Sequence, residues 1–324
     1  MNCLLFSSLN LLSLFLRSAD RLYDKYMSKI HSRNILTNQY NDIIPTGWLS
    51  AYSRTFTDIP YSQAVFNELE TIKTVDGSDE QLDAMKDNRL APQFEARHKL
   101  LNRLIAQTGI KQIIEVAAGL STRGLELTAD SEINYVEIDL PLMADDKRKI
   151  ITNLNQKGIV PKKPNLHIES GSAINLTDLL KAVSHFDVSR PVVVVNEGLL
   201  RYFGFEDKAI YANNVKALLR KFGGRWITSD ISLPKIIRAE NDITARNRKQ
   251  VSEITGVSID NNLFKDEQDA KNFFETLGQQ VESHSFLEII NELTAPGRLG
   301  MTKDYVELIN RSAVIFVMKL EGQS

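Results

Sequence analysis

QIIEVAAGLSTRGLEL, residues 112–127, joins a short β-branched run to a turn of small residues. The β-branched side chains within residues 113–116 predict a buried strand. The small residues 117–119 predict a tight turn at which a ligand can approach the backbone. Ser121 and Thr122 are favourable N-cap residues, so we expect a helix from this point to the end of the stretch.

A second strand and an acidic residue follow at the spacing of a nucleotide-binding fold. We expect this strand at residues 133–138, and Asp139 stands at its end, twenty positions after Gly119. A strand, a small-residue turn, a helix and a second strand that ends in an acid form the Rossmann-type arrangement. In that arrangement the acid binds a ribose hydroxyl.

The composition of the turn bears on which nucleotide it takes. A dinucleotide site needs glycines at fixed offsets so that the backbone touches a pyrophosphate. Here Ala117 stands where such a glycine would be, and only Gly119 and Gly124 follow. A nucleoside without phosphate, such as S-adenosylmethionine, needs less anion binding, and Glu115 suits a cationic ligand. A strand, turn and helix that bind nothing form the alternative at this point.

The composition excludes several classes of site. The chain has 324 residues, 43% hydrophobic and 25% charged, with a net charge of −2, so no bulk charge favours nucleic acid or an anionic membrane. Cys3 is the single cysteine, which excludes an intrachain disulfide and a cysteine-cluster zinc site and fits a reducing cytoplasm. The five histidines show no HxxxH or HExxH spacing, so we expect no metal site.

We expect three regions along the chain. Residues 1–26 form an apolar N-terminal extension, whose apolar run from Cys3 to Leu16 is too short to span a bilayer. This extension is a weak signal-like segment, an amphipathic helix or a product of start-codon choice, and Met27 would make a normal N-terminus. Residues 27–110 form a helical cap or lid. Residues 111–324 form a Rossmann-like domain with an insertion at about 233–265.

Five further strands complete the expected sheet. Four consecutive valines at 192–195 indicate burial on both faces and hence a central parallel strand. Polar residues 196–198 follow it, at the strand end where open α/β sheets bind ligands. The last two strands lie late, which fits a hairpin-like antiparallel edge. The five strands are expected at residues 166–169, 192–195, 226–231, 280–286 and 313–319.

Four motifs in this order resemble the leucine carboxyl methyltransferase family, which includes protein-phosphatase C-terminal methyltransferases and related polyketide O-methyltransferases. They are EVAAGLSTRGLEL, VEIDLP, VVVVNEGLLRYF and GGRWITSD, and the resemblance covers about residues 45–320. The family pattern E-[LV]-G-A-G-x-D-T-R is matched at Glu115, Ala118, Gly119, Thr122 and Arg123. Ala117 replaces a glycine of this pattern, and Ser121 replaces an aspartate.

The resemblance implies a Rossmann-like class I methyltransferase of the α/β class. Its seven-stranded, mostly parallel sheet has an antiparallel last strand and helices on both faces. S-adenosylmethionine is the implied cofactor, with Arg97 at its carboxylate, Asp139 at its ribose and Glu197 beside its amino group or sulfonium. For Arg97 a solvated surface charge is the alternative. The implied cofactor-binding residues are Arg97, Glu115, Ala117, Gly119, Asp139, Leu140, Ser172, Ala173 and Glu197.

The implied reaction is direct SN2 methyl transfer to an acidic oxygen of a small molecule or a protein C-terminus. A carboxylate acceptor is already anionic at pH 7 and needs no base. Tyr202 is a weak candidate for orienting the acceptor, and a packed tyrosine is its alternative. A nicotinamide-dependent oxidoreductase and a non-catalytic S-adenosylmethionine-binding protein remain the rival functions. We expect a cytoplasmic protein without nucleic-acid partners or stable membrane insertion, and its oligomeric state stays open.

Overall fold

The structure is a computed structural model that describes residues 44–77, 80, 83, 86–231 and 259–322. The expected apolar extension at 1–26 and most of the expected insertion at 233–265 lie outside these residues. In the described ranges no helix combines the length and the apolar character needed to cross a membrane.

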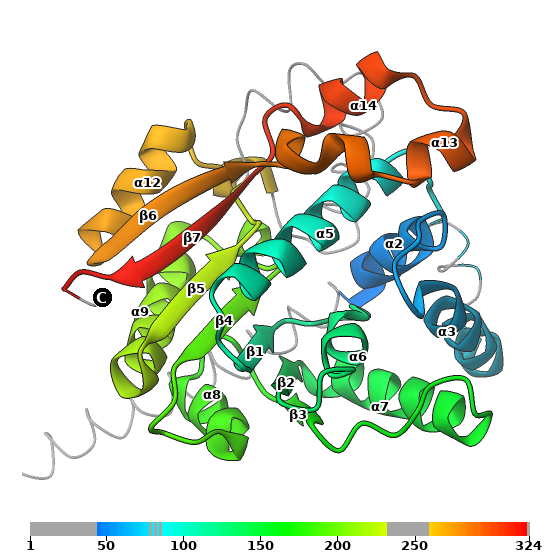
Figure 1. Cartoon of the computed structure of the whole chain (residues 1–324), viewed down its shortest axis with the longest axis horizontal. Helices are drawn as coiled ribbons and strands as arrows, with labels where there is room; N and C mark the ends of the chain where they lie inside the picture. The colour runs from blue at the N-terminus through cyan, green and yellow to red at the C-terminus, as the bar shows by residue number, and fades with distance from the viewer. Residues whose placement is uncertain (1–43, 78–79, 81–82, 84–85, 232–258, 323–324) are drawn as a thin grey trace, which may run out of the picture. The chain divides into compact units, whose positions relative to one another are not determined.

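Seven strands form one sheet in the order β3-β2-β1-β4-β5-β7-β6 (Figure 1). The first five strands pair in parallel, and β7 runs antiparallel to both β5 and β6. This arrangement confirms the predicted mostly parallel sheet with its antiparallel last strand. The strands are β1 (Gln112–Val116), β2 (Asn134–Asp139), β3 (Leu166–Ser170), β4 (Val192–Asn196), β5 (Gly224–Thr228), β6 (Gln279–Ser285) and β7 (Val314–Leu320).

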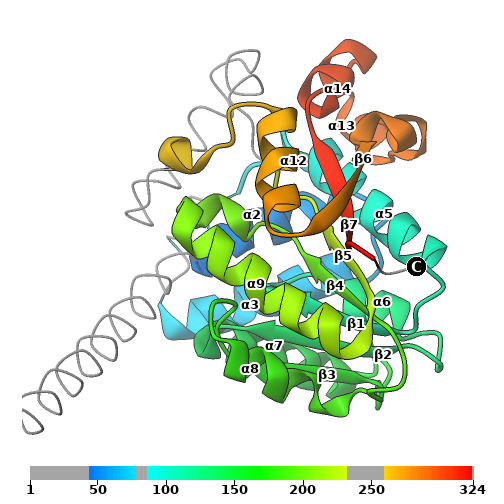
Figure 2. The same cartoon turned by 90° about the vertical axis from the view of Figure 1, so that its left-hand side faces the viewer.

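Helices cover both faces of the sheet. Helices α5, α6 and α7 lie on one face, and α8, α9 and α12 lie on the other (Figures 1 and 2). The helices are α2 (Ile44–Arg54), α3 (Ser62–Asp76), α5 (Ala91–Gln107), α6 (Arg123–Leu127), α7 (Pro141–Gln156), α8 (Leu176–Ala182), α9 (Phe205–Phe222), α12 (Glu267–Thr276), α13 (Ala295–Leu299) and α14 (Lys303–Asn310). Short 3₁₀ turns are η1 (Val183–His185), η2 (Leu200–Tyr202), η3 (Ile259–Asn262) and η4 (Phe286–Glu292).

Strand β4 is central, as its valine run predicts. Residues 192–195 are completely buried, because β1 and β5 flank the strand and helices cover both of its faces. Side chains alternate between the faces. Ile113, Tyr135 and Val193 pack with α5 on one face. On the other face the Trp226 ring packs edge-on against Tyr211.

Two element starts differ in detail from the sequence prediction. Strand β5 begins at Gly224 and not at residue 226. The backbone of Gly224, with φ 113°, lies against that of Val192, so there is no room for a side chain at this position. Helix α6 begins at Arg123 with Thr122 at the N-cap, but the Thr122 side chain makes no capping hydrogen bond. Instead the Ser121 hydroxyl accepts from the Arg123 amide at 3.3 Å.

Candidate functional site

The turn after β1 is the centre of the candidate site. Ala117 and Gly119 both adopt the left-handed backbone conformation, with φ 57° and 51°. The Ala117 amide donates to the carbonyl of Ile138 at 2.8 Å, which holds the turn against the end of β2. A Cβ placed on Gly119 would meet no heavy atom within 4 Å, so the space beside this backbone is open.

Asp139 closes β2 beside this turn. Its Oδ2 accepts from the Gly119 amide at 2.6 Å, and its Oδ1 accepts from the Leu140 amide at 2.7 Å. Burial raises the pKa of Asp139, although the two backbone hydrogen bonds favour its ionised form. Because a carboxylate oxygen has two lone pairs, each oxygen retains acceptor capacity for a further donor.

Three arginines surround Glu197, which follows β4 directly. Oε1 pairs with Arg54 and, at 2.9 Å, accepts from Nε of Arg97. Oε2 accepts from Nη2 of Arg123 at 2.7 Å. Burial alone would raise the pKa of Glu197, but Arg97, Arg54 and Arg123 outweigh it and hold that pKa well below its usual range. Glu197 is therefore ionised, with its lone pairs directed at guanidinium groups.

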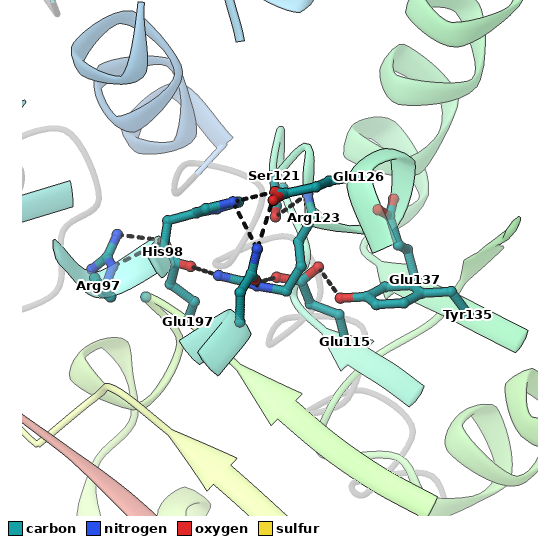
Figure 3. Close-up of polar contacts among 12 residues, drawn as sticks. Arg97, His98, Glu115, Ser121, Arg123, Glu126, Tyr135, Glu137 and Glu197 are labelled. Carbon is teal, nitrogen blue, oxygen red and sulfur yellow. Dashed lines mark hydrogen bonds and ion pairs between the residues drawn. The ribbon is translucent and has the colours of Figure 1, made fainter. Parts of the chain in front are cut away.

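Arg123 is fully buried and connects Glu197 to the first strand. Figure 3 shows it between Glu197 and Glu115, with which it forms a second ion pair. Its Nε donates to Oδ1 of Asn102 on α5 at 2.8 Å. The Tyr135 hydroxyl donates to Glu115 Oε2 at 2.8 Å. Glu115 points into this face of the sheet because side chains alternate along β1.

A second buried carboxylate, Glu137, lies on the same face (Figure 3). The Lys147 ammonium of α7 lies 2.5 Å from its Oε2, yet neither carboxyl oxygen receives a well-aligned hydrogen bond from a described residue. Burial, opposed by Lys147 and reinforced by Glu115, raises the pKa of Glu137 to about 7. A Cβ on Gly124 would lie 2.4 Å from Glu137 Oε1, so only glycine fits there.

His98 of α5 belongs to the same polar cluster as Asn102. His98 Nε2 is 2.8 Å from Glu126 Oε2, which also accepts from Asn102 at 3.0 Å. Burial lowers the pKa of His98 despite the hydrogen bond to Glu126. His98 is therefore a neutral, buried member of the polar cluster and not a surface group (Figure 3).

The turn after β3 holds two further predicted residues. The Ser172 amide donates to Oδ2 of Asp178 at 2.9 Å, and Ala173 is buried with its carbonyl accepting from Asn214. Gly171 gives the Asp178 side chain its room, because a Cβ there would approach the Asp178 Cβ to 2.7 Å. The carboxylate near this turn thus comes from α8 and not from the turn itself.

Two side chains of helix α2 contact residues that follow β4. The Tyr202 hydroxyl and the Thr46 hydroxyl are 2.8 Å apart, and Arg54 at the end of α2 contacts Glu197. Tyr202 is buried, in agreement with a packed tyrosine. No group of three or more histidine, cysteine or acidic side chains suited to a metal ion occurs within the described ranges.

The sequence matches the model of a known protein family. The model of the leucine carboxyl methyltransferase family matches residues 53–214, half of the chain. The chain belongs to the leucine carboxyl methyltransferase family. This result confirms the resemblance seen in the motifs.

Relatives of this methyltransferase family member are found in mycobacteria. A Mycolicibacterium smegmatis protein, named as a candidate S-adenosyl-L-methionine-dependent methyltransferase, is 29% identical over 117 residues, 36% of this chain and 38% of that protein. A Mycobacterium tuberculosis protein with the same designation is 32% identical over 107 residues, 33% and 34% of the two chains. The chain thus spans little more than a third of the length of these relatives.

Solved structures show a more distant likeness. A DUF574 family protein from Streptomyces avermitilis is 15% identical, with a TM-score of 0.48, and the match covers 84% of this chain and 96% of that one.

Most of the predicted site residues lie at one edge of the sheet. Asp139 is the last residue of β2, and the others follow β1, β2, β3 or β4, as Gly119, Leu140, Ser172, Ala173 and Glu197 do. Arg97 is not a solvated surface charge, because its side chain is 14% exposed and paired with Glu197.

Two residues that contact Glu197 or its turn were not predicted as site residues. Arg54 lies 143 positions from Glu197, and nothing in its own neighbourhood marks it as a partner of that carboxylate. Asp230 was visible only as an acid near the end of the fifth strand, and its contacts with the Glu197 turn depend on the sheet order.

Proposed function

We propose that the chain is an S-adenosylmethionine-dependent O-methyltransferase. The observation that carries this proposal is the turn after β1, whose Gly119 amide donates to Asp139 at the ends of two adjacent parallel strands. Open parallel sheets bind nucleotides at this edge. Membership of the leucine carboxyl methyltransferase family and the designations of the mycobacterial relatives support the same reaction class.

The residues present fit this cofactor. The open space at Gly119 allows a ligand against the backbone, and Asp139 retains acceptor capacity for two ribose hydroxyls. The turn lacks the glycine pattern that a pyrophosphate requires, which favours S-adenosylmethionine over a nicotinamide dinucleotide. In this proposal Leu140, Ser172 and Ala173 line the ribose and adenine side.

Charge supports the placement of the amino-acid end of the cofactor near Arg97. The guanidiniums of Arg54, Arg97 and Arg123 face the carboxylates of Glu115 and Glu197. A guanidinium that reaches solvent can donate charge-assisted hydrogen bonds to an anionic ligand. Arg97 has the most exposed side chain of the three arginines, so we assign it to a carboxylate.

Three of the proposed residues act indirectly. Glu115 is bonded to Arg123 and Tyr135, so its task in this proposal is to hold Arg123 and not to touch the ligand. Ala117 contributes its left-handed backbone conformation to the turn. Glu197 keeps the three arginines together and sets the direction in which Arg97 points.

The chain's part in the reaction is positioning. Bound S-adenosylmethionine supplies a methyl group activated by its sulfonium. The residues around Glu197 hold the acceptor oxygen in line with that methyl group and exclude water, and alignment of this kind is the main source of rate in such a transfer.

The acceptor in this proposal is a carboxylate of a small molecule or a protein C-terminus. Such a group is anionic at pH 7. A hydroxyl acceptor would need a general base. His98 is buried and bonded to Glu126, so it is not placed to act as one.

Ligand binding tests the proposal first. We expect S-adenosylhomocysteine and S-adenosylmethionine to raise the melting temperature and to bind in calorimetric titrations, whereas NAD and NADP do neither. A ligand at one hundred times its Kd stabilises a protein by about 2.7 kcal/mol, which is easily detected. Stabilisation by a nicotinamide dinucleotide alone would overturn the proposal.

Methyl transfer tests the acceptor class. The protein is incubated with S-adenosylmethionine carrying a labelled methyl group and with matched panels of carboxylic acids and alcohols. An alkali-labile product, as a methyl ester is, supports a carboxylate acceptor. An alkali-stable product contradicts the carboxylate but keeps the O-methyltransferase. Binding without transfer to any member of either panel favours the non-catalytic alternative.

A further inference from the structure

Asp230 lies two residues after β5, is 6% exposed, and accepts four hydrogen bonds from the residues around Glu197. Its Oδ2 accepts from the side-chain amide of Asn196 at 2.7 Å and from the backbone amides of Leu199 at 2.7 Å and Leu200 at 3.1 Å. Its Oδ1 accepts from the amide of Gly198 at 2.5 Å. One carboxylate therefore binds groups on both sides of Glu197.

The turn that Asp230 binds has a specific shape. Gly198 has φ 79°, and the successive amides of residues 198–200 converge on the Asp230 carboxylate. Successive amides in such a turn form a concave site for an anion. Here the anion belongs to the protein, so the turn carries its own counter-charge.

Asn196, whose side-chain amide binds Asp230, is itself held by hydrogen bonds in the core. Asn196 Oδ1 accepts from Nε1 of Trp226 at 2.7 Å and from the hydroxyl of Tyr211 at 3.3 Å. Its side-chain amide also donates to the Thr228 hydroxyl at 2.8 Å. These groups are buried and come from β4, β5 and α9, so the Asp230 carboxylate is held to a rigid part of the molecule.

The side chains of Asn196 and Glu197 point to opposite faces of the sheet, and this links the Asp230 contacts to Glu197. Asn196 points to the face covered by α9, and Glu197 therefore points to the opposite face, toward Arg97 and Arg123. Asp230 binds the Asn196 side chain before Glu197 and the backbone amides of the turn after it. The direction of the Glu197 carboxylate depends on that backbone.

We propose that Asp230 is a positioning residue for the cofactor site: it fixes the turn after β4 and thereby aims Glu197 and the arginines bound to it. This inference rests on the proposed function. It goes beyond it because, among the described residues, the hydrogen bonds that the Asp230 carboxylate accepts come from Asn196 and the turn after β4 and not from the residues proposed to touch the cofactor.

The test compares Asp230→Asn with a double variant that exchanges the two side chains, Asn196→Asp with Asp230→Asn. Asp230→Asn should weaken S-adenosylhomocysteine by about tenfold or more, as loss of a supporting contact does at other sites. In the double variant Trp226 still has an acceptor at residue 196, but the amide nitrogen at residue 230 cannot accept from the backbone amides of the turn, so affinity should stay as low as in Asp230→Asn, and its recovery would overturn the inference.

A matched control separates positioning from general stability. Val194→Ala makes a cavity in the same strand, where Val194 is completely buried, but leaves the Asp230 contacts intact. It should lower the melting temperature and leave the affinity for S-adenosylhomocysteine unchanged. Equal losses of affinity in Val194→Ala and Asp230→Asn would overturn the inference, as would an Asp230→Asn protein that binds like the wild type.

A second variant reaches the same turn if Asp230→Asn does not fold. Gly198→Ala strains the backbone at φ 79°, while its new Cβ meets no heavy atom within 4 Å. Its affinity should fall with little change in melting temperature, and an unchanged affinity counts against the inference. If the wild type itself fails to bind S-adenosylhomocysteine, the proposed function fails, an outcome distinct from failure of the Asp230 inference.

Discussion

Three arginines share Glu197, but they are held to different degrees. Arg123 has no exposed side-chain surface and is also bound by Glu115 and Asn102. Arg97 reaches solvent and packs over the Phe94 ring. Arg54 is buried, and its Nε has no hydrogen-bond partner among the described residues. A ligand that competes for Glu197 would therefore displace Arg54 more easily than Arg123.

Asp139 is the residue whose loss should weaken the cofactor most directly. Charge-assisted hydrogen bonds contribute about 1.5–3 kcal/mol each. We expect Asp139→Ala to weaken S-adenosylmethionine and S-adenosylhomocysteine by similar factors, about tenfold or more, because both carry the ribose. Calorimetric titration measures this. The control is Asp145→Ala, an exposed acid on α7, which should bind both ligands normally. Unchanged affinity in Asp139→Ala would place the ribose elsewhere.

Ala117 allows a test of backbone strain. Its φ of 57° costs a non-glycine residue about 1–2 kcal/mol. Ala117→Gly removes that strain but adds about 0.4–1 kcal/mol of chain entropy to the unfolded state. We expect a free energy of unfolding that is unchanged or up to about 1.6 kcal/mol higher. Urea unfolding measures it.

The neighbouring alanine provides the control for this strain. Ala118 has no positive φ and is buried, so Ala118→Gly loses a packed methyl group and should destabilise the protein. If Ala117→Gly destabilises the protein as much as Ala118→Gly, the left-handed turn is not strained.

Helix α6 packs closely against β2. Gly124 allows this approach, because a Cβ there would meet Glu137 Oε1 at 2.4 Å and the Leu166 side chain at 2.8 Å. Glycine at this position of a Rossmann turn permits close packing of the helix on the strand. The short helix is therefore placed by the glycine and not by an N-cap side chain.

Gly124→Ala should displace α6 from β2. Overpacking of this kind costs about 1–3 kcal/mol, and the contact here is with a buried carboxylate. We expect a lower free energy of unfolding and, because Arg123 begins α6, weaker binding of S-adenosylhomocysteine. Gly297→Ala is the control, since that helical glycine has open space around it and should be neutral or slightly stabilised. Equal behaviour of the two variants would contradict tight packing at Gly124.

The sequence predicted elements better than it predicted contacts. The valine run of β4 and the β-branched residues of β1 are local signals, and burial on both faces made their strands recognisable. The resemblance to the family pointed to Asp139, Glu197 and Arg97. The partners Arg54 and Asp230 depend on which strand ends and helices meet in space, and no local pattern records that.

Over the whole molecule, the described interior contains a row of charges on one face of the sheet. Glu115 and Glu197 form ion pairs with arginines, whereas Glu137 forms its ion pair with Lys147. The pKa of Glu137 is raised to about 7, which makes it the carboxylate of this row that titrates near neutrality. The free energy of unfolding should therefore depend on the titration of Glu137.

The sign of the pH effect follows from linkage. The ordinary pKa of the Glu137 carboxyl is 4.5 and its folded value is about 7. Below pH 4.5 both states are protonated, and between these values the folded state holds a proton that the unfolded state has lost. The contribution of Glu137 is thus fully present below pH 4.5 and is lost as pH rises through about 7. Its upper bound is about 3 kcal/mol.

Glu137→Gln should remove this dependence. We expect the free energy of unfolding of the wild type, minus that of the variant, to fall by up to about 3 kcal/mol between pH 4.5 and pH 8, because the amide does not titrate. Urea unfolding at several pH values measures the difference. Glu132→Gln, in the loop before β2 and 75% exposed, is the control and should give a flat difference. A flat or rising difference for Glu137→Gln would mean that Lys147 holds Glu137 ionised throughout, and the buried row would then be charge-paired along its whole length.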